Sequence, residues 1–431
     1  MERIKRRNVS WAEEDWISQL PEHLIDSILE RLPIEDAVRT SILSKIWRHR
    51  WTTMRALVFD PKFSRKFAKN GAFGRNGFIR IINKVLILHK GPILKFALYI
   101  PNVFLDSFQE VDQFMLLLSR NSLTELIIIN TNQRYELPSC VFSCLELRSL
   151  KTTNGFFNPP REFEGFLNLE ELSLKHIDFG DRLCGTRINL PRLKTLTLNT
   201  CTNVYNFNIK ATKLQNLFVI ACPDAMLLRL LESRCLFQVW IAFEKPIQDF
   251  VGVEKMTLAK MLSNFPRVRQ FYIDSYFLKF FIAEKIPKLL PHTIYSLKQL
   301  RLFHYQLADL HQLHGALCLL RNSPNLETLH IFMAMETWVD VGAASNHLES
   351  PNCLDCTLEQ LQTVEMTYLE GSKPELLFIK LILAHSPSLQ KFTITPSKAS
   401  DVQKRLDIAM DIMQFPRAST KAKMFYLNPK P

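Results

Sequence analysis

The sequence lacks any run of about 18 uncharged apolar residues, the length that a membrane-spanning helix requires. Its first residues, MERIKRRNVSWAEEDW, are basic but contain no apolar stretch, so no secretory leader is predicted. Nine cysteines, an odd number scattered over 431 residues, do not form the pattern of a secreted disulfide framework. We therefore expect a soluble protein of the cytoplasm, the nucleus or both, with reduced thiols and no membrane partner.

Motifs of catalysis and metal binding are scarce as well. Cys353 and Cys356 have the spacing of half a zinc site, but no second cysteine pair or His-x-x-x-His completes it. Gly71, Gly74 and Gly77 lack the Gly-Lys-Ser/Thr ending and the preceding strand of a phosphate-binding loop, so we expect a flexible loop there. No His-Glu-x-x-His or Gly-x-Ser-x-Gly motif occurs. The sequence predicts no metal, no cofactor and no catalytic residue.

The net charge of +12 comes from 54 basic and 42 acidic residues that are mostly interleaved. The exceptions are KRR at residues 5–7 and the acid-free stretch at residues 61–80. Neither carries a recognised reading motif, so solvated basic faces are expected and nucleic-acid binding is disfavoured. A basic scaffold that binds RNA or another polyanion is kept as the alternative function. The basic side chains of the second stretch are Lys62, Arg65, Lys66, Lys69, Arg75 and Arg80.

A Leu-x-x-Leu-x-Leu pattern, with Val, Ile or Phe variants, recurs along most of the chain. The first five steps are 21 to 24 residues long, and longer insertions follow Leu236. Each unit is expected to place a short strand beside its neighbour, with the leucines in a core that no single unit could close. The pattern begins at Leu123, Leu147, Leu169, Leu193, Leu214, Leu236, Val268, Leu297, Leu326, Leu361 and Leu389.

These repeats resemble a degenerate plant-type leucine-rich repeat array. Cys201 and Cys222 stand three positions after the last apolar position of their units, Leu198 and Val219, where a polar residue satisfies backbone groups in the turn. Apolar residues three and four apart predict helices over residues 308–324 and 374–387. The resemblance implies an α/β solenoid with parallel strands on its concave side and helices and loops on its convex side.

Residues 15–51 read as a three-helix unit that is too small to bury its own apolar surface. Pro21 suits the first helical turn, and Pro33 stops the first helix. The surplus surface packs either on the first solenoid turn or on another protein. The expected apolar positions are Leu24, Ile25, Ile28, Leu29 and Leu32 in the first helix, Ile34, Ala37, Val38 and Ile42 in the second, and Trp47, Trp51 and Met54 in the third.

The texts ISQLPEHLIDSILERLP and AVRTSILSKIWRHRW closely resemble the plant F-box. They depart from it at Ile46, where arginine is customary, and at His49 and Arg50, where an aromatic-leucine pair is common. The resemblance implies that this segment binds a Skp-type adaptor. The adaptor contact is carried over to Leu20, Pro21, Leu24, Ile28, Leu29, Leu32, Val38, Leu43 and Trp47.

The C-terminal text FPRASTKAKMFYL, with Phe415 to Ser419 as its most recognisable part, resembles the FBD region of plant F-box proteins. Such a block could also cap the open end of a solenoid. The expected domains are an F-box at 12–58, a connecting segment with the first solenoid turns at 59–120, leucine-rich repeats at 121–349 and the FBD region at 350–431.

The resemblance implies a non-catalytic, substrate-recognition subunit of an SCF-type ubiquitin ligase, joined through the adaptor to a cullin and a ubiquitin-conjugating enzyme. An adaptor-bound protein that never joins a ligase is a further alternative. An unknown target protein would bind the strand positions between the buried leucines. These are Glu171, Ser173, Lys175, Thr195, Thr197, Asn199, Asn216, Phe218, Ile220, Gln299, Arg301 and Phe303.

Overall fold

The computed structural model forms two compact units, residues 1–147 and residues 148–431, which are described separately. None of the helices in the described part of the chain has both the length and the apolar content needed to cross a bilayer. The described residues are 20–67, 71–101, 108–180, 187–204, 207–222, 233–243, 262, 265–281, 293–334, 341–398 and 401–429.

The first unit opens with a helical segment, residues 20–54, and continues as parallel strands that alternate with helices. Strands β1, β2 and β3 pair in that order and in parallel. Strands β1 and β2 come before Leu123, the first match of the repeat pattern. Their texts LVF and FALYI alternate but lack the leading leucine of the pattern, so the pattern does not identify them. The elements are α1 (Glu22–Leu29), α2 (Ile34–Arg39), the 3-10 helices η1 (Thr40–Ile42) and η2 (Trp47–Thr53), β1 (Ala56–Phe59), α3 (Pro61–Arg65), α4 (Gly71–Leu88), β2 (Lys95–Ile100), α5 (Gln109–Ser119), β3 (Glu125–Asn130), β4 (Tyr135–Glu136) and α6 (Ser139–Phe142).

The glycine-rich stretch that we expected to be a flexible loop is the start of helix α4. That expectation was wrong because the following residues have helical apolar spacing, and Phe78, Ile82 and Val85 are buried. Gly77 lies against Phe67, whose ring would be 3.4 Å from a methyl group added there. The packing of α4 therefore outweighs the weak helix propensity of glycine.

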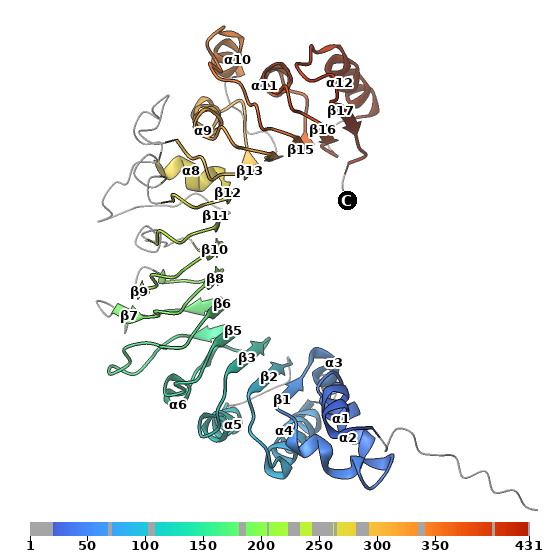
Figure 1. Cartoon of the computed structure of the whole chain (residues 1–431), viewed down its shortest axis with the longest axis vertical. Helices are drawn as coiled ribbons and strands as arrows, with labels where there is room; N and C mark the ends of the chain where they lie inside the picture. The colour runs from blue at the N-terminus through green and yellow to red at the C-terminus, as the bar shows by residue number, and fades with distance from the viewer. Residues whose placement is uncertain are drawn as a thin grey trace, which may run out of the picture. The chain divides into compact units, whose positions relative to one another are not determined.

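The second unit is a parallel sheet in which nearly every strand is followed by a loop or a helix. Every one of the eleven pattern matches leads into a strand, Leu123 into β3 and the other ten into β5 to β16. Helices α9, α10 and α11 lie on one side of strands β13 to β16 (Figure 1), and we call the opposite side the inner face. The inner-sheet strands are β5 (Ser149–Phe156), β6 (Glu171–Asp178), β8 (Thr195–Asn199), β10 (Asn216–Ile220), β11 (Gln238–Ala242), β12 (Gln270–Asp274), β13 (Gln299–Tyr305), β14 (Thr328–Met333), β15 (Thr363–Leu369), β16 (Lys391–Pro396) and β17 (Lys423–Tyr426).

Among its described residues, the second unit also contains a small two-stranded sheet and five helices. Two of the helices, α9 and α11, were predicted from the sequence, and both are found. These additional elements are β7 (Arg187–Asn189), β9 (Asn208–Lys210), α8 (Ser275–Phe281), α9 (Leu310–Arg321), α10 (Val341–Glu349), α11 (Lys373–His385) and α12 (Val402–Gln414).

The repeat leucines form the core of the second unit. Leu150, Leu172 and Leu196 are almost completely buried, and strand register aligns them in one row. In the turns, the Cys201 N–H donates to the Cys222 Sγ at 3.4 Å, and both thiols are buried. The cysteines thus occupy the backbone-satisfying position that the sequence predicted.

Two buried thiols allow a chemical test of this packing. Burial raises the pKa of both Cys144 and Cys318 to about 11. Because the thiolate is the nucleophile, we expect neither residue to be alkylated by iodoacetamide in the folded chain at pH 8. Mass spectrometry of peptides from native and urea-unfolded samples checks this, with modification expected only after unfolding. Rapid modification of Cys318 in the native chain would show that α9 is not packed as described.

Candidate protein-binding surfaces

The N-terminal helical segment has a small core of its own. Ile25 and Leu29 of α1 are buried, as are Trp47 and Trp51 of η2 and Met54 beyond it. Their burial uses one stripe of α1 and leaves its other apolar stripe outside the core. The segment is therefore a folded unit rather than an unstructured tail, and its exposed stripe is held on a fixed scaffold.

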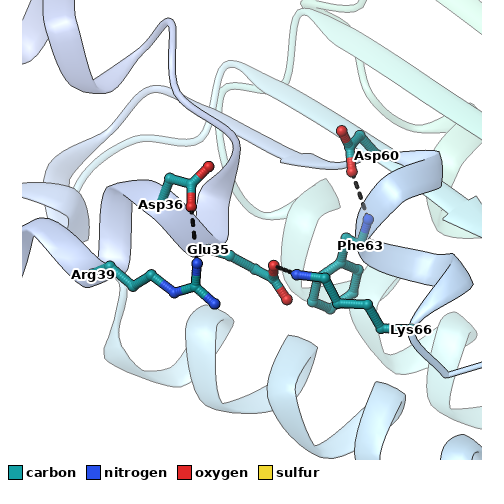
Figure 2. A network of polar contacts seen from close by, with 6 residues as sticks. All are labelled: Glu35, Asp36, Arg39, Asp60, Phe63 and Lys66. Carbon is teal, nitrogen blue, oxygen red and sulfur yellow. Dashed lines mark hydrogen bonds and ion pairs between the residues drawn. The ribbon is translucent and has the colours of Figure 1, made fainter.

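Ion pairs hold the helices of this segment in place. Arg50 of η2 donates a hydrogen bond to Glu22 at the start of α1, and this bond holds the pKa of the Glu22 carboxyl below its usual value. Figure 2 shows Glu35 of α2 paired with Lys66, which follows α3. Because the pair joins residues that are far apart in the sequence, it fixes α2 against the α3 region.

Figure 2 also shows how α2 and α3 are ordered locally. The Asp60 carboxylate accepts a hydrogen bond from the Phe63 N–H at 2.7 Å and so caps the start of α3. Arg39 and Asp36 are 3.3 Å apart on the exposed surface of α2. Such an exposed pair contributes little stability, on the order of 0 to 1 kcal/mol. The Asp60 cap therefore orders the start of α3, and the partly exposed Glu35–Lys66 pair adds a modest contact between α2 and the residue after α3.

Five large apolar side chains of the segment are exposed, and we call them the N-terminal apolar patch. Leu24 and Ile28 lie one helical turn apart on α1 and are 43% and 40% exposed. Ile42, Leu43 and Ile46 lie in and after η1 and are 87%, 54% and 49% exposed. Exposed apolar side chains concentrated in so short a segment indicate a surface for another protein.

The predicted adaptor-contact residues divide into three groups by their burial. Pro21, Leu24, Ile28 and Leu43 are exposed. Leu20, Leu32 and Val38 are half-buried. Leu29 and Trp47 are 0% and 2% exposed, so they have no surface left for a direct contact and belong to the core. For these two residues the structure corrects the predicted direct contact.

Sequence reasoning missed Ile42 and Ile46. Ile42 was expected among the apolar positions of the second helix, but α2 ends at Arg39 and the chain continues as the 3-10 helix η1. A 3-10 helix has three residues per turn, so the change of period turns Ile42 away from the core. The unusual apolar residue at position 46 was a signal that could have been read as surface.

A second candidate surface is the inner face of the second unit. Parallel register places one residue from each strand in a continuous row. At its β5–β6 end, Lys151 and Glu171 are paired at 2.8 Å, and further along, Asn216 of β10 donates to the Thr195 hydroxyl of β8 at 3.1 Å. Lys175 is exposed, and Ser173, Thr197, Asn199 and Ile220 are half-buried. The row runs through Lys151, Ser173, Thr197, Phe218, Trp240, Tyr272, Arg301, His330 and Glu365.

Aromatic rings gather on the middle of this face. The ring of Trp240 stacks on Phe303 at 5.6 Å between centroids, and Phe303 stacks on Phe332 at 4.7 Å. Trp240 also meets Tyr272 edge to face at 5.5 Å. We call Phe218, Trp240, Tyr272, Phe303 and Phe332 the inner aromatic surface.

The predicted target-binding residues Phe218, Gln299, Arg301 and Phe303 all belong to this part of the inner face. Trp240, Tyr272 and Phe332 were missed. They occupy the same outward positions in the texts LFQVWI, VRQFYI and LETLHIFM, so the repeat alternation could have identified them. Within the described residues, no group of three or more His, Cys, Asp or Glu side chains could hold a metal ion.

Comparison with known proteins gives two matching domain families and full-length relatives. The F-box domain family model matches residues 17–58, and the FBD family model matches residues 351–394. An F-box/FBD/LRR-repeat protein of Arabidopsis thaliana is 30% identical over 96% of this chain and 99% of its own length. A probable FBD-associated F-box protein of the same plant is 24% identical over 94% of this chain and 98% of its own. A leucine-rich repeat protein of Leptospira interrogans, a solved structure, is 15% identical with a TM-score of 0.30 and covers 79% of this chain and 85% of its own.

Proposed function

Because the chain belongs to the plant F-box/FBD/LRR-repeat family, we propose that it is the substrate-recognition subunit of an SCF-type ubiquitin ligase. In this role it binds a Skp-type adaptor through the F-box and, through the adaptor, joins a cullin and a ubiquitin-conjugating enzyme in the cytoplasm or nucleus. The chain performs no covalent chemistry itself. It raises the effective concentration of a bound target near the conjugating enzyme.

The observation that supports this proposal is the N-terminal apolar patch. A monomer gains nothing from keeping Ile42 at 87% exposure beside exposed Leu43 and Ile46. Each Å² of apolar surface that is removed from water contributes about 25 cal/mol of favourable free energy, so burial of the patch by an adaptor stabilises the complex. The core residues Ile25, Leu29 and Trp47 hold the patch in shape from beneath.

Co-expression of the full chain with a Skp-type adaptor tests this proposal. We expect the two chains to co-purify as one complex, and we expect a cullin to bind that complex but not the free chain. An apolar interface is nearly indifferent to salt, so retention should be the same at about 50 and 200 mM. An adaptor complex that never takes up a cullin would indicate adaptor binding without a ligase role.

Binding to RNA is the competing function, and the structure favours it less. In the acid-free basic stretch, Lys66 is paired with Glu35, and Arg75 is 3.3 Å from Glu110. Cations that are already paired add less to the attraction of a phosphate backbone. A polyuridylate complex that dissociates steeply between about 50 and 200 mM salt, with no adaptor binding, would support the competing function instead.

A further inference from the structure

The inner aromatic surface surrounds one arginine that has no acidic partner among the residues the structure describes. The Arg301 guanidinium lies 4.8 Å from the centroid of the Tyr272 ring. Its neighbours in the row are Tyr272 on β12 and His330 on β14. A cation stacked on an aromatic face keeps its N–H groups free for a carboxylate, which it can bind with two parallel hydrogen bonds.

The platform under Arg301 is held rigidly. Tyr272 is 5% exposed, and its hydroxyl donates to the Gln299 side-chain oxygen at 3.1 Å. Asp274 lies two residues after Tyr272 in the same strand and is fully buried. Its carboxylate accepts hydrogen bonds from the N–H groups of Phe243 and Phe277 at 2.7 and 2.8 Å. Asp274 is in register with Phe303 of β13 and is fully buried, and the rings of Trp240 on β11 and Phe303 on β13 stack across β12.

Those rings form a flat apolar column beside the arginine. Trp240 and Phe303 are within 4° of parallel, and Phe303 and Phe332 are within 8°. All three side chains are half-buried, so part of each ring is accessible. On the far side, Glu365 lies 3.8 Å from His330 and places a negative charge at β15. Beside the aromatic column, an anion is therefore attracted at Arg301 and repelled toward β15.

We propose that the inner aromatic surface binds a segment of the target protein in which one acidic side chain lies next to an aromatic or large aliphatic side chain. The carboxylate pairs with Arg301, and the apolar side chain packs on the column formed by Trp240, Phe303 and Phe332. Glu365 repels a second acid placed toward β15, so the position of the acid also fixes the direction of the segment. This inference rests on the proposed function, because it names the class of target that the F-box protein recruits.

The test uses the full chain bound to the Skp-type adaptor and a display library of random peptides. We expect selected peptides to be enriched in Asp or Glu adjacent to Trp, Phe, Tyr or Leu. Arg301→Glu should weaken the binding of a selected peptide at least about tenfold, since a hydrogen-bonded charge pair is lost. Trp240→Ala should remove the preference for aromatic residues. Lys175→Glu is the matched control, because it makes the same charge change at an exposed position of the same face on β6 and should leave binding unchanged.

Four results would overturn the inference: no selected peptides, peptides without the acidic-apolar pairing, an equal loss with Lys175→Glu, or displacement of the peptide by polyuridylate. An equal loss with the control would show a diffuse attraction to a basic chain. Adaptor co-purification is measured on the same samples, and both charge variants should retain it. Loss of the peptide preference with the adaptor still bound contradicts this inference alone, whereas peptide binding without any adaptor contact contradicts the proposed function.

Discussion

Replacement of Ile28 and Leu43 together by aspartate is expected to abolish capture of the Skp-type adaptor. Both side chains lie in the N-terminal apolar patch, at 40% and 54% exposure, so the change does not place a charge in the core. If the adaptor buries both side chains, each replacement removes roughly 1.5 kcal/mol or more of favourable binding free energy from apolar burial. Each aspartate must also be desolvated on binding. Together these terms correspond to a loss of at least about a hundredfold in affinity. Titration of labelled adaptor against each variant measures it.

The matched control is the double change Leu116→Asp and Leu117→Asp. These leucines are in helix α5 of the same unit, and both are 46% exposed, which is close to the exposure of the two test residues. The control should bind adaptor as the unchanged chain does, and thermal unfolding should be alike for all three proteins. Adaptor binding that survives the change at Ile28 and Leu43 would refute the assignment of the patch. An equal loss in the control would point to a general effect of added negative charge.

Much of the second unit could be predicted from the sequence because its local pattern and its packing require the same residues. In LRSLKT, LEELSL and LKTLTL, alternate residues face opposite sides of a strand, and a leucine in front closes each turn. Every such text became a strand with its leucines buried. The long insertions carry no comparable pattern. Where a helical period did appear, before Leu326 and Leu389, the predicted helices α9 and α11 are found.

Elements whose structure depends on distant contacts were not predictable in the same way. The glycines of α4 were read as a loop because the side chain that packs against Gly77, Phe67, lies outside the helix and its glycine spacing. The F-box resemblance assigned Leu29 and Trp47 to the adaptor contact, although both are buried in the small core of the N-terminal segment. The stacking of Trp240 on Phe303 joins two strands that are not adjacent, so it depends on the register of both strands with β12 between them. Alternation alone could identify these side chains as facing away from the core, but it could not predict which of them stack on one another.

The C-terminal region matched by the FBD family model depends on one buried carboxylate, and its removal should destabilise the end of the sheet. Helix α11 begins with a capping box in which Ser372 and Glu375 satisfy each other's backbone groups. The Glu375 Oε2 atom accepts hydrogen bonds from the N–H groups of Glu370, Gly371 and Ser372 at 3.2, 2.7 and 2.9 Å. Gly371 adopts a φ of 79°, which is accessible to glycine and tightens the turn around the carboxylate.

Glu375→Ala should therefore lower the free energy of unfolding by about 3 kcal/mol. Three backbone donors lose their partner in a site where Glu375 is 4% exposed, and each unsatisfied donor costs about 1 to 3 kcal/mol, less whatever water restores. Chemical denaturation measures the change, and Glu375→Gln, which keeps an uncharged oxygen acceptor, should lose about half as much.

Hydrogen exchange separates a local effect from a global one. In a repeat protein each turn contacts mainly its neighbours, so loss of the cap should speed exchange in α11 and in the flanking strands β15 and β16 first. Peptides from β6 should exchange as before, because that strand lies many turns away in the same sheet. Unchanged stability in Glu375→Ala would show that water replaces the carboxylate at no cost. Uniformly faster exchange would show that the second unit unfolds as one cooperative body, and the FBD region would then be a structural part of the whole sheet rather than an end cap.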